Sequence, residues 1–226
     1  MEQKLAAKNK HPCFILVRPQ MGENIGAAAR AMWNFGLERM RVVSPRDGWP
    51  NQKAVAMASG AGRLLDEALI FPTFEEAIAD QNFVFATTAR PRDLIKPIYS
   101  PKDAIRLAVS KMSEGQNVGF IFGPERSGLE NSDIVKTNAI ISVPVNDHFP
   151  SLNLAQCVLV LAYEWMLNLN NSDIDSSTSD QSNVVSNMQV EKLCNYFEEN
   201  LEEVGFFYPE DKAESMKINF RNMWSR

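Results

Sequence analysis

The chain has 226 residues, of which 45% are apolar and 23% charged, and its formal net charge is −5. This composition is ordinary for a globular protein, and no secretory signal or membrane-spanning run of roughly 18 apolar residues is recognised, so no membrane association is expected. Three widely spaced cysteines and two histidines argue against a disulfide framework and against a metal site, and they favour a cytoplasmic protein.

The charge is distributed unevenly along the chain. Residues 1–63 hold ten basic and four acidic side chains, whereas residues 164–226 hold five basic and twelve acidic ones. A negative total argues against nucleic-acid binding. The basic first part keeps that possibility open for a part of the surface.

Strands and helices are predicted to alternate through residue 169. An apolar strand at 13–18 precedes an alanine-rich helix at 24–35, which ends at Gly36. Further strands are predicted at 40–44, 68–71, 82–87, 117–122 and 139–143, and further helices at 74–80, 101–111 and 151–169. Thr73 and Ser100 are suitable N-caps for two of these helices. This order predicts an α/β fold with a mostly parallel sheet and helices on both faces.

The last quarter of the chain has a different composition. Residues 170–187 are polar and predict a flexible linker between a domain at 1–169 and a small helical C-terminal extension at 188–226. Apolar side chains at helical spacing predict the buried faces: Leu154, Val158, Leu161, Trp165 and Leu169 before the linker, and Val190, Leu193, Phe197, Leu201 and Val204 after it.

Four unusual segments follow predicted strands, where open α/β sheets bind ligands. In the first, Gly22 and Gly26 surround Asn24, and Arg30 follows. The small residues suit either a phosphate-binding turn or tight packing of the helix against the sheet, and the spacing matches no nucleotide-binding fingerprint. Arg30 alone is typical of a solvated or salt-bridged side chain.

The second and third segments carry charge on constrained loops. Arg90 and Arg92 alternate around a proline, which suits either a phosphate clamp or a surface loop paired with local acids. The loop from Gly123 to Gly128 follows a strand directly and favours backbone groups that face a ligand. Within it, Glu125 either orients an arginine or the substrate, or is an ordinary exposed carboxylate.

The fourth segment, residues 144–153, leads into the long helix. Ser151 is predicted to be its N-cap, and Asn153 is placed in its first turn. A serine hydrolase is not favoured, because no GxSxG motif is present.

Together these segments resemble the motifs of the SpoU (TrmH) group of the SPOUT superfamily of RNA 2′-O-ribose methyltransferases. The first motif corresponds to NIGAAARA at 24–31, the second to VGFIFGPERSG at 118–128, and the third ends in SLNLA at 151–155. The TTARPR stretch at 87–92 and the acidic tail with GFFYPE are similar to the TrmJ-type branch. The stretch RDGW at 46–49 lies outside these motifs.

The resemblance implies a deep trefoil knot in the sheet, S-adenosyl-L-methionine as cofactor, and an obligate homodimer with tRNA as substrate. The expected target is the pyrimidine at position 32 of the anticodon loop. Cofactor-binding residues are expected among Thr87, Thr88, Ala89, Gly123, Val143, Pro150, Ser151 and Leu152. No metal is needed for methyl transfer.

The same resemblance gives roles to the polar side chains. Arg30, Ser151 and Asn153 are the expected catalytic residues, with Arg30 on the RNA phosphate and the attacking 2′-oxygen. Asn24, Arg90, Arg92 and Glu125 are expected to bind or orient the RNA and Arg30. The alternatives are methylation of another tRNA position or of rRNA, and a non-catalytic RNA-binding member of the fold; a dinucleotide-binding oxidoreductase is disfavoured by the missing fingerprint.

Overall fold

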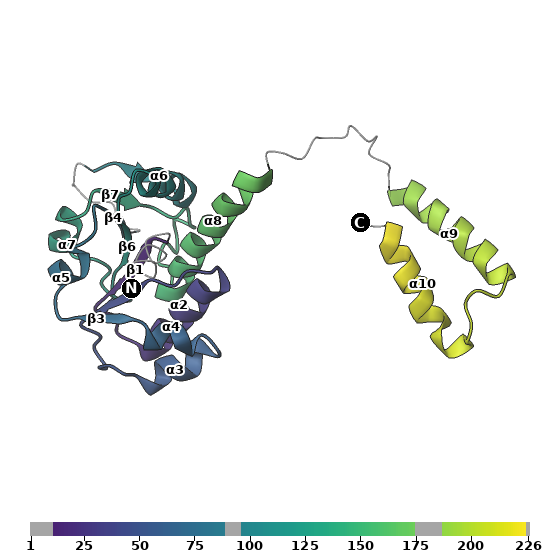
Figure 1. Ribbon diagram of the computed structural model, residues 1–226, viewed down its shortest axis with the longest axis horizontal. Helices are drawn as coiled ribbons and strands as arrows, with labels where there is room; N and C mark the ends of the chain where they lie inside the picture. Colours follow the sequence, from purple (N-terminus) through teal and green to yellow (C-terminus); the bar gives the residue numbers. More distant parts are fainter. Residues whose placement is uncertain (1–10, 89–95, 175–186, 225–226) are drawn as a thin grey trace. The chain divides into compact units, whose positions relative to one another are not determined.

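A single parallel sheet organises the first part of the protein (Figure 1). The computed structural model describes residues 11–88, 96–174 and 187–224, and the chain divides into two units, Met1–Ser176 and Ser177–Arg226. The strands are β1 (Cys13–Val17), β2 (Met40–Val43), β3 (Leu69–Phe71), β4 (Phe83–Thr87), β5 (Ile98–Tyr99), β6 (Val118–Phe122) and β7 (Ala139–Ile141). Their order is β3-β2-β1-β6-β4-β7-β5, and every pairing is parallel, which confirms the predicted sheet.

Helices cover both faces of the sheet, as predicted (Figure 1). One face carries α2 (Gly22–Asn34), α3 (Gln52–Ala58), α4 (Gly62–Asp66), α6 (Pro101–Ser113) and α8 (Leu154–Ile174). The other face carries the short helices α5 (Phe74–Ile78) and α7 (Asn131–Val135). The trefoil knot stays a prediction of the family resemblance.

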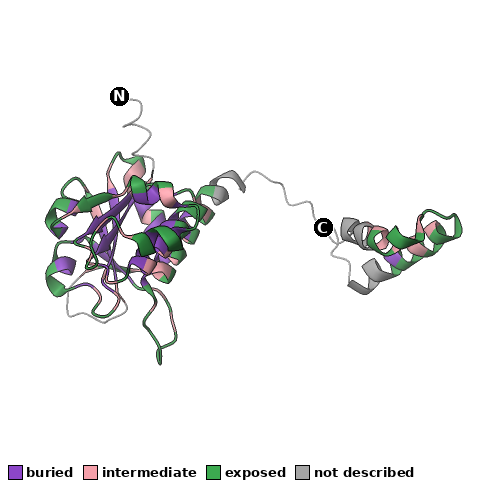
Figure 2. Cartoon of the chain, turned by 90° about the horizontal axis from the view of Figure 1, so that it is seen from below, coloured by how far each residue is buried: buried purple, intermediate pink, exposed green. Residues whose placement is uncertain are grey.

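The core lies on both sides of the sheet because successive strand residues point to opposite faces. In β1, Phe14 and Leu16 pack under the five-helix face, whereas Cys13, Ile15 and Val17 pack under α5 and α7. Figure 2 shows the buried residues concentrated along the strands and the inner sides of the helices. The central strands are therefore apolar on both faces, which is why they appear in the sequence as continuous apolar runs.

Four short elements were not predicted. These are α3, α4, α7 and the two-residue strand β5, which are too short to show a clear apolar period. The predicted caps at Thr73 and Ser100 are confirmed: each hydroxyl oxygen accepts a backbone N–H three residues later, at 3.3 Å and 3.2 Å.

The glycines of the first motif bring α2 and α3 together. A Cβ on Gly22 would lie 2.1 Å from Oδ1 of Asn51, and one on Gly26 would lie 2.1 Å from the carbonyl oxygen of Ala54. A Cβ at Gly26 would collide with backbone, and one at Gly22 would displace the Asn51 side chain, so the glycines serve tight packing. Their partner is helix α3 and not the sheet, which was the expected partner.

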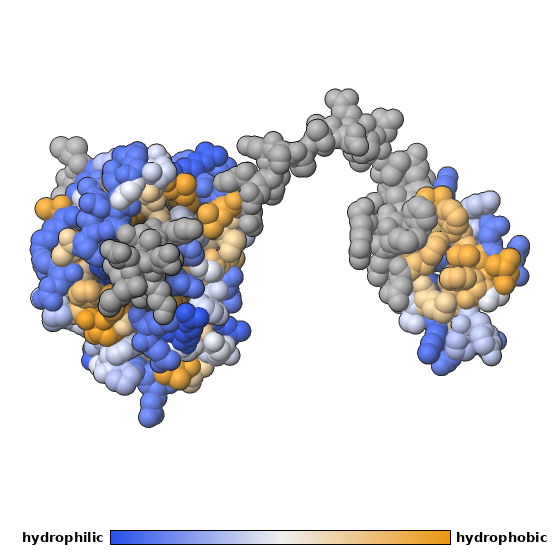
Figure 3. Space-filling model, in the orientation of Figure 1, coloured by the Kyte–Doolittle hydropathy of each residue, from blue (hydrophilic) through white to orange (hydrophobic). Residues whose placement is uncertain are grey.

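The second unit is a helical hairpin of α9 (Asn187–Glu203) and α10 (Glu210–Trp224), which confirms the predicted helical extension. Its predicted apolar stripe is partly wrong, because Leu193 and Val204 are exposed and Cys194 is buried instead. A two-helix hairpin buries only the line of side chains between its helices, and Figure 3 shows the apolar surface that remains on it. No helix among the described residues is long and apolar enough to span a membrane.

The long helix α8 also differs from its prediction. It begins at Leu154 instead of residue 151 and continues to Ile174, so that it extends into the first residues of the predicted linker. Most of residues 170–187 lie outside the described part, and the division into domains at 169 and 187 stays a prediction. Leu154, Val158, Leu161 and Trp165 are buried as predicted, whereas Leu169 is exposed.

Candidate active site

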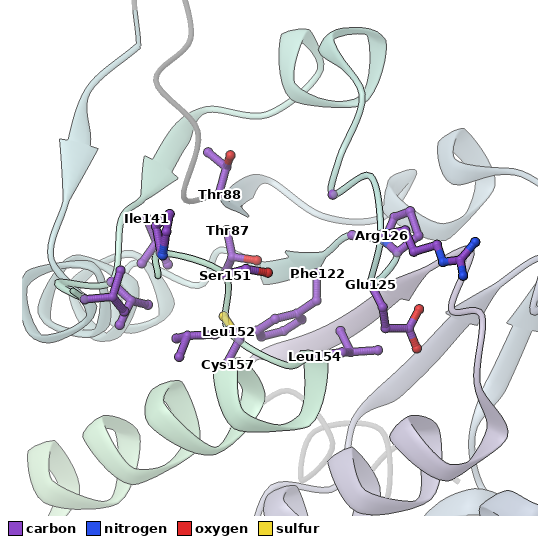
Figure 4. A pocket seen from close by; sticks show the side chains of 16 residues that line it. Thr87, Thr88, Phe122, Glu125, Arg126, Ile141, Ser151, Leu152, Leu154 and Cys157 are labelled. Carbon is purple, nitrogen blue, oxygen red and sulfur yellow. The ribbon is translucent and has the colours of Figure 1, made fainter. Parts of the chain in front are cut away.

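A cavity of about 360 Å³ lies at the carboxyl ends of β4, β6 and β7 (Figure 4). Three separate segments of the chain line it: the end of β4, the loop after β6, and the stretch from the end of β7 to the first turn of α8. The lining residues are Thr87, Thr88, Phe122, Gly123, Pro124, Glu125, Arg126, Gly128, Ile141, Val143, Val145, Pro150, Ser151, Leu152, Leu154 and Cys157. All seven cofactor candidates that the structure describes are among them.

The loop after β6 is held in a tight turn by its glycines. A Cβ on Gly123 would lie 2.3 Å from the backbone nitrogen of Leu129, and Gly128 has a positive φ of 65°. The N–H of Gly128 donates to the carbonyl oxygen of Pro124 at 2.8 Å. A side chain at Gly123 would force this turn open, so the glycine fixes one wall of the cavity.

Glu125 connects this loop to the start of α2. Its carboxylate accepts hydrogen bonds from the backbone N–H of Gln20 at 2.8 Å and of Met21 at 3.2 Å, and from Nδ2 of Asn24 at 2.7 Å. The donors at the beginning of α2 are therefore already bound by a carboxylate. A phosphate-binding turn at this helix terminus is not supported, because the anion would meet the negative charge of Glu125.

Asn153 extends the same network to α8. Its Nδ2 donates to Oδ1 of Asn24 at 2.9 Å, while its Oδ1 accepts the backbone N–H of Ala155 at 2.8 Å. Asn153 is thus the N-cap of α8, and the prediction of Ser151 as the cap is wrong, because the helix starts three residues later. Ser151 is instead exposed at the cavity.

The cavity floor contains a thiol that sequence analysis did not single out. Burial raises the pKa of Cys157 to about 11, and a hydrogen bond with Thr87 opposes part of that rise. The thiol is therefore protonated at neutral pH and is a weak nucleophile. Cys157 and Leu154 lie three residues apart on one face of α8. Because α8 begins directly after the Ser151 segment, this spacing could have predicted that both side chains line the cavity.

Arg30 lies outside this cavity. It is exposed in the ninth position of α2, and it makes no hydrogen bond or ion pair with the described residues. The other predicted arginines, Arg90 and Arg92, lie outside the described residues, as does Ala89. The structure therefore unites Asn24, Glu125, Ser151 and Asn153 around the cavity and leaves Arg30 apart from them.

An apolar surface accompanies Arg30. Leu159, Tyr163 and Leu167 follow one another at i, i+4 spacing along α8, and each is at least one-third exposed. Trp33 of α2 is also exposed, and Phe35 packs edge-on against Tyr163 at 6.0 Å between ring centroids. We call these five residues the α2–α8 face. Exposed apolar surface of this kind is a candidate interaction site.

Among the described residues, no group of three His, Cys, Asp or Glu side chains is arranged to hold a metal ion. The polar groups of the cavity are hydroxyls, one arginine and one carboxylate, and apolar side chains form most of its remaining wall. This combination suits an organic ligand with an aromatic or aliphatic body and a few hydrogen-bonding groups.

Comparison with known proteins identifies the family. Residues 12–163 match the model of the SpoU rRNA Methylase family. The chain is 33% identical to the tRNA (cytidine-2′-O-)-methyltransferase TrmJ of Methanocaldococcus jannaschii, with 94% of this chain and 90% of the relative covered. It is 31% identical to the tRNA (cytidine/uridine/adenosine-2′-O-)-methyltransferase TrmJ of Pseudomonas aeruginosa, with 94% and 85% covered.

Solved structures agree with this assignment. The crystal structure of TrmJ from Z. mobilis ZM4 superposes with a TM-score of 0.66 at 43% identity, with 95% of this chain and 90% of that chain covered. The motifs that carry the sequence resemblance form the walls of the cavity and the network behind it. The chain therefore belongs to the SpoU methylase family and is a homologue of the TrmJ methyltransferases.

Proposed function

We propose that this protein transfers a methyl group from S-adenosyl-L-methionine to a ribose 2′-hydroxyl of tRNA. The observation that carries the proposal is the cavity itself, which is built from all three segments that follow β4, β6 and β7 and is tied by Glu125 and Asn153 to the first motif on α2. The relatives whose names specify tRNA 2′-O-methylation align over most of this chain.

The cavity fits the cofactor in size and chemistry. A volume of about 360 Å³ lies in the usual range of about 300–1,000 Å³ for small-molecule sites. Phe122, Ile141 and Leu152 offer apolar contacts for an adenine ring, and Thr87 and Ser151 offer hydroxyls. The full proposed set is Thr87, Thr88, Ala89, Gly123, Val143, Pro150, Ser151 and Leu152. When bound, S-adenosyl-L-methionine supplies a methyl group on a positively charged sulfur.

The active site needs Arg30 from a second subunit. Arg30 is exposed outside the cavity of its own chain, and the neighbouring α2–α8 face is mainly apolar, with the Arg63 guanidinium 5.8 Å from the centroid of the Trp33 ring. A homodimer that buries this face places Arg30 of one chain at the cavity of the other. In that arrangement neither subunit has a complete site by itself.

The polar residues then divide into two roles. The guanidinium of Arg30 stabilises the negative charge that develops on the 2′-oxygen, as the oxygen bonds to the methyl carbon and the hydroxyl proton passes to water. Ser151 orients the attacking oxygen with its exposed hydroxyl, and Arg90 and Arg92 bind RNA phosphate. Asn24, Glu125 and Asn153 position the loops, because their polar atoms are already engaged with one another and with backbone groups.

The proposed target is the pyrimidine at position 32 of the anticodon loop, with the cytoplasm as the cellular site of action. Free cysteines at positions 13, 157 and 194 are in keeping with a reducing compartment. The names of the relatives differ in nucleotide preference, which includes cytidine, uridine and adenosine. The nucleotide at position 32 is therefore the variable to test.

The experiment is a methyl-transfer assay on tRNA transcripts with cytidine, uridine, adenosine or guanosine at position 32. The purified chain and S-adenosyl-L-methionine are incubated with each transcript, and 2′-O-methyl groups are mapped by mass spectrometry of nuclease digests. We expect one methyl group at position 32 in the pyrimidine transcripts. Methylation of a base, of a different position, or of no tRNA would contradict the proposal.

A further inference from the structure

Arg18 directly follows β1 and has an unusual backbone conformation. Its φ is +47°, in the left-handed region that residues with a side chain rarely adopt, and its N–H donates to the carbonyl oxygen of Val43 at 2.8 Å. Val17 packs under α5 and α7, so regular alternation would direct the next side chain to the five-helix face. The left-handed turn breaks this alternation and leaves the Arg18 side chain on the side of α7.

The guanidinium of Arg18 binds the carboxylate of Asp133 on α7 at two points. Nη1 donates to Oδ1 at 3.3 Å and Nη2 donates to Oδ2. The side chain of Asp133 is only 6% exposed, and its Oδ2 also accepts the backbone N–H of Glu130 at 2.9 Å. Because a buried carboxylate without a cationic partner destabilises a fold, Arg18 is needed where it lies.

Asp133 belongs to the helix that directly follows the loop after β6, which forms one wall of the cavity. Leu129 and Ile134 are buried among the residues that pack under α5 and α7. Apolar packing of this kind has no preferred direction, whereas a planar guanidinium on a carboxylate fixes distance and orientation together. The pair of Arg18 and Asp133 therefore holds the end of this loop in a defined position against β1, the strand to which β6 is paired.

The pair differs in its task from the hydrogen bonds of Glu125. Glu125 connects the loop after β6 to Gln20 and Asn24 and thereby to α2, the helix that carries Arg30. Arg18 instead connects the helix at the end of the same loop to the edge of the sheet. One set of contacts positions α2 relative to the loop, and the other positions the loop relative to the strands that form the rest of the cavity.

We propose that Arg18 and Asp133 are positioning residues for the binding of S-adenosyl-L-methionine, because their ion pair sets the place of the cavity wall. Neither residue lines the cavity, so both act through the loop after β6 and not on the cofactor. A displaced wall weakens binding in the ground state and in the transition state alike, so KM rises while kcat changes little. This inference rests on the proposed function, since it concerns the same cavity.

The test compares the wild type with Arg18→Met, Arg18→Lys and the double variant that combines Arg18→Met with Asp133→Asn. Calorimetry measures the Kd for S-adenosyl-L-methionine, hydrogen exchange measures opening of the loop after β6 in the free protein, and steady-state methylation gives KM and kcat. For Arg18→Met we expect Kd, KM and the exchange rate to rise about 10-fold, with kcat changed less than about threefold. Arg18→Lys keeps the charge without the fork and should recover part of the affinity.

The double variant separates positioning from the effect of an unpaired charge. It leaves no buried carboxylate without a partner, and the amide at position 133 can still accept the N–H of Glu130. Its melting temperature should therefore return towards that of the wild type. The Kd should stay raised, because the connection between the loop and the end of β1 is still missing.

Asp80→Asn is the matched control. It breaks the bidentate pair with the buried Arg41, and neither residue lines the cavity. We expect the melting temperature to fall by about 3–6 °C and the Kd for S-adenosyl-L-methionine to change less than about twofold. The inference is overturned if Arg18→Met shows the same behaviour as this control, or if the double variant regains wild-type affinity together with its stability.

Failure of this inference and failure of the proposed function are distinguishable. A wild type that binds no S-adenosyl-L-methionine overturns both. A wild type that binds the cofactor and methylates tRNA, but whose Kd does not respond to Arg18→Met, removes only the positioning role of the pair.

Discussion

The cavity at the carboxyl edge of the sheet and the α2–α8 face differ in how completely their side chains are paired. Around the cavity, Asn24, Glu125 and Asn153 use their polar atoms in a continuous set of hydrogen bonds. On the α2–α8 face, Trp33, Tyr163 and neighbouring apolar groups are exposed, and Arg30 is exposed beside them. The hydrogen bonds of the first region are satisfied within one chain, whereas the second region exposes apolar side chains beside Arg30.

A single helix contributes to both regions. Asn24 and Arg30 are six residues apart on α2, which advances the helix by about 9 Å and rotates it by roughly 240°. The two side chains therefore point to different sides of the same element. The first motif therefore contributes to its own cavity through Asn24 and, in the proposed dimer, to the partner's cavity through Arg30.

Removal of Arg30 should have the largest effect. Arg30→Ala is expected to lower kcat by about 100- to 1,000-fold, because a group that stabilises the developing oxyanion is lost. Cofactor affinity and thermal stability should not change, since the side chain is exposed and makes no hydrogen bond or ion pair with the part of the chain that the structure describes. Single-turnover methylation measures the rate of methyl transfer, and calorimetry measures cofactor affinity and thermal stability. Turnover within tenfold of the wild type would refute the role of Arg30.

Mixed dimers sharpen this test, because they show whether the site is shared. Gly123→Ala should prevent cofactor binding, since its Cβ would lie 2.3 Å from the backbone of Leu129. Co-refolding of this variant with Arg30→Ala should restore about one-quarter of the wild-type activity if Arg30 acts on the partner's cavity, because half of randomly mixed dimers are hybrids and each hybrid has one intact site. No recovery would place Arg30 and the cavity within one chain.

A charge on the α2–α8 face should separate the subunits. Leu159→Glu is expected to convert the dimer to a monomer and to lower activity about 100-fold, because a carboxylate would be desolvated in the interface. Analytical ultracentrifugation and methyl-transfer rates test this. Leu69→Glu, on the exposed edge strand β3, is the control and should change neither the oligomeric state nor the rate of methyl transfer. A Leu159→Glu protein that remains dimeric would show that the interface lies elsewhere.

Disruption of the hydrogen-bond network around Glu125 should lower methyl transfer less than removal of Arg30. Glu125→Gln replaces a carboxylate that accepts three hydrogen bonds with a group that has only one acceptor oxygen. We expect kcat to fall about 10-fold and cofactor affinity to change less than threefold, because α2 and the loop after β6 lose their connection. Glu67 is an exposed carboxylate paired with Arg63, so the control variant Glu67→Gln should change neither kcat nor cofactor affinity. Equal rates for the two variants would argue against a positioning role of Glu125.

The smallest effect on activity is expected far from the cavity, at the buried Arg41. Its guanidinium forms a bidentate pair with Asp80, at 2.5 Å and 2.6 Å, which lowers the pKa of Asp80 to about 2. Since the carboxyl binds protons more weakly in the folded state, this stabilisation is present above about pH 4 and is lost as the pH falls towards about 2. Asp80→Asn should cost about 1–2 kcal/mol at neutral pH and flatten this pH dependence in urea titrations, with methyl transfer changed less than twofold. Unaltered stability at pH 7 would contradict the importance of the pair.

The sequence predicted the strands better than the short helices for a physical reason. β1 and β6 are buried on both faces, so their apolar runs stand out without any knowledge of neighbours. Helix α3 has no such signal, because its buried residues, Ala54 and Ala58, are small, and Ala54 lies against Gly26 of α2. Helix α7 begins at a capping box of Glu130 and Asp133, a pattern too common in loops to identify a five-residue helix.

The candidate site was predictable in its residue types and less so in its connections. The motif resemblance pointed to Asn24, Glu125, Ser151 and Asn153, and all four lie at or behind the cavity. It did not indicate that Asn153 caps α8, that Glu125 binds the start of α2, or that Cys157 and Arg126 line the cavity. These facts depend on which strand ends are neighbours, and the order β1-β6-β4-β7 is not readable from local patterns.

The sequence by itself determined the family, the parallel α/β architecture and the segments that supply the chemistry, because motifs and apolar periods are local properties of the chain. Only the tertiary structure decided that Asn24, Glu125 and Asn153 form one hydrogen-bonded unit and that Arg30 lies outside the cavity. Contacts between residues more than 100 positions apart, such as Asn24 and Asn153, follow from the crossing of chain segments at the sheet edge. That crossing is a property of the whole fold, and no single segment encodes it.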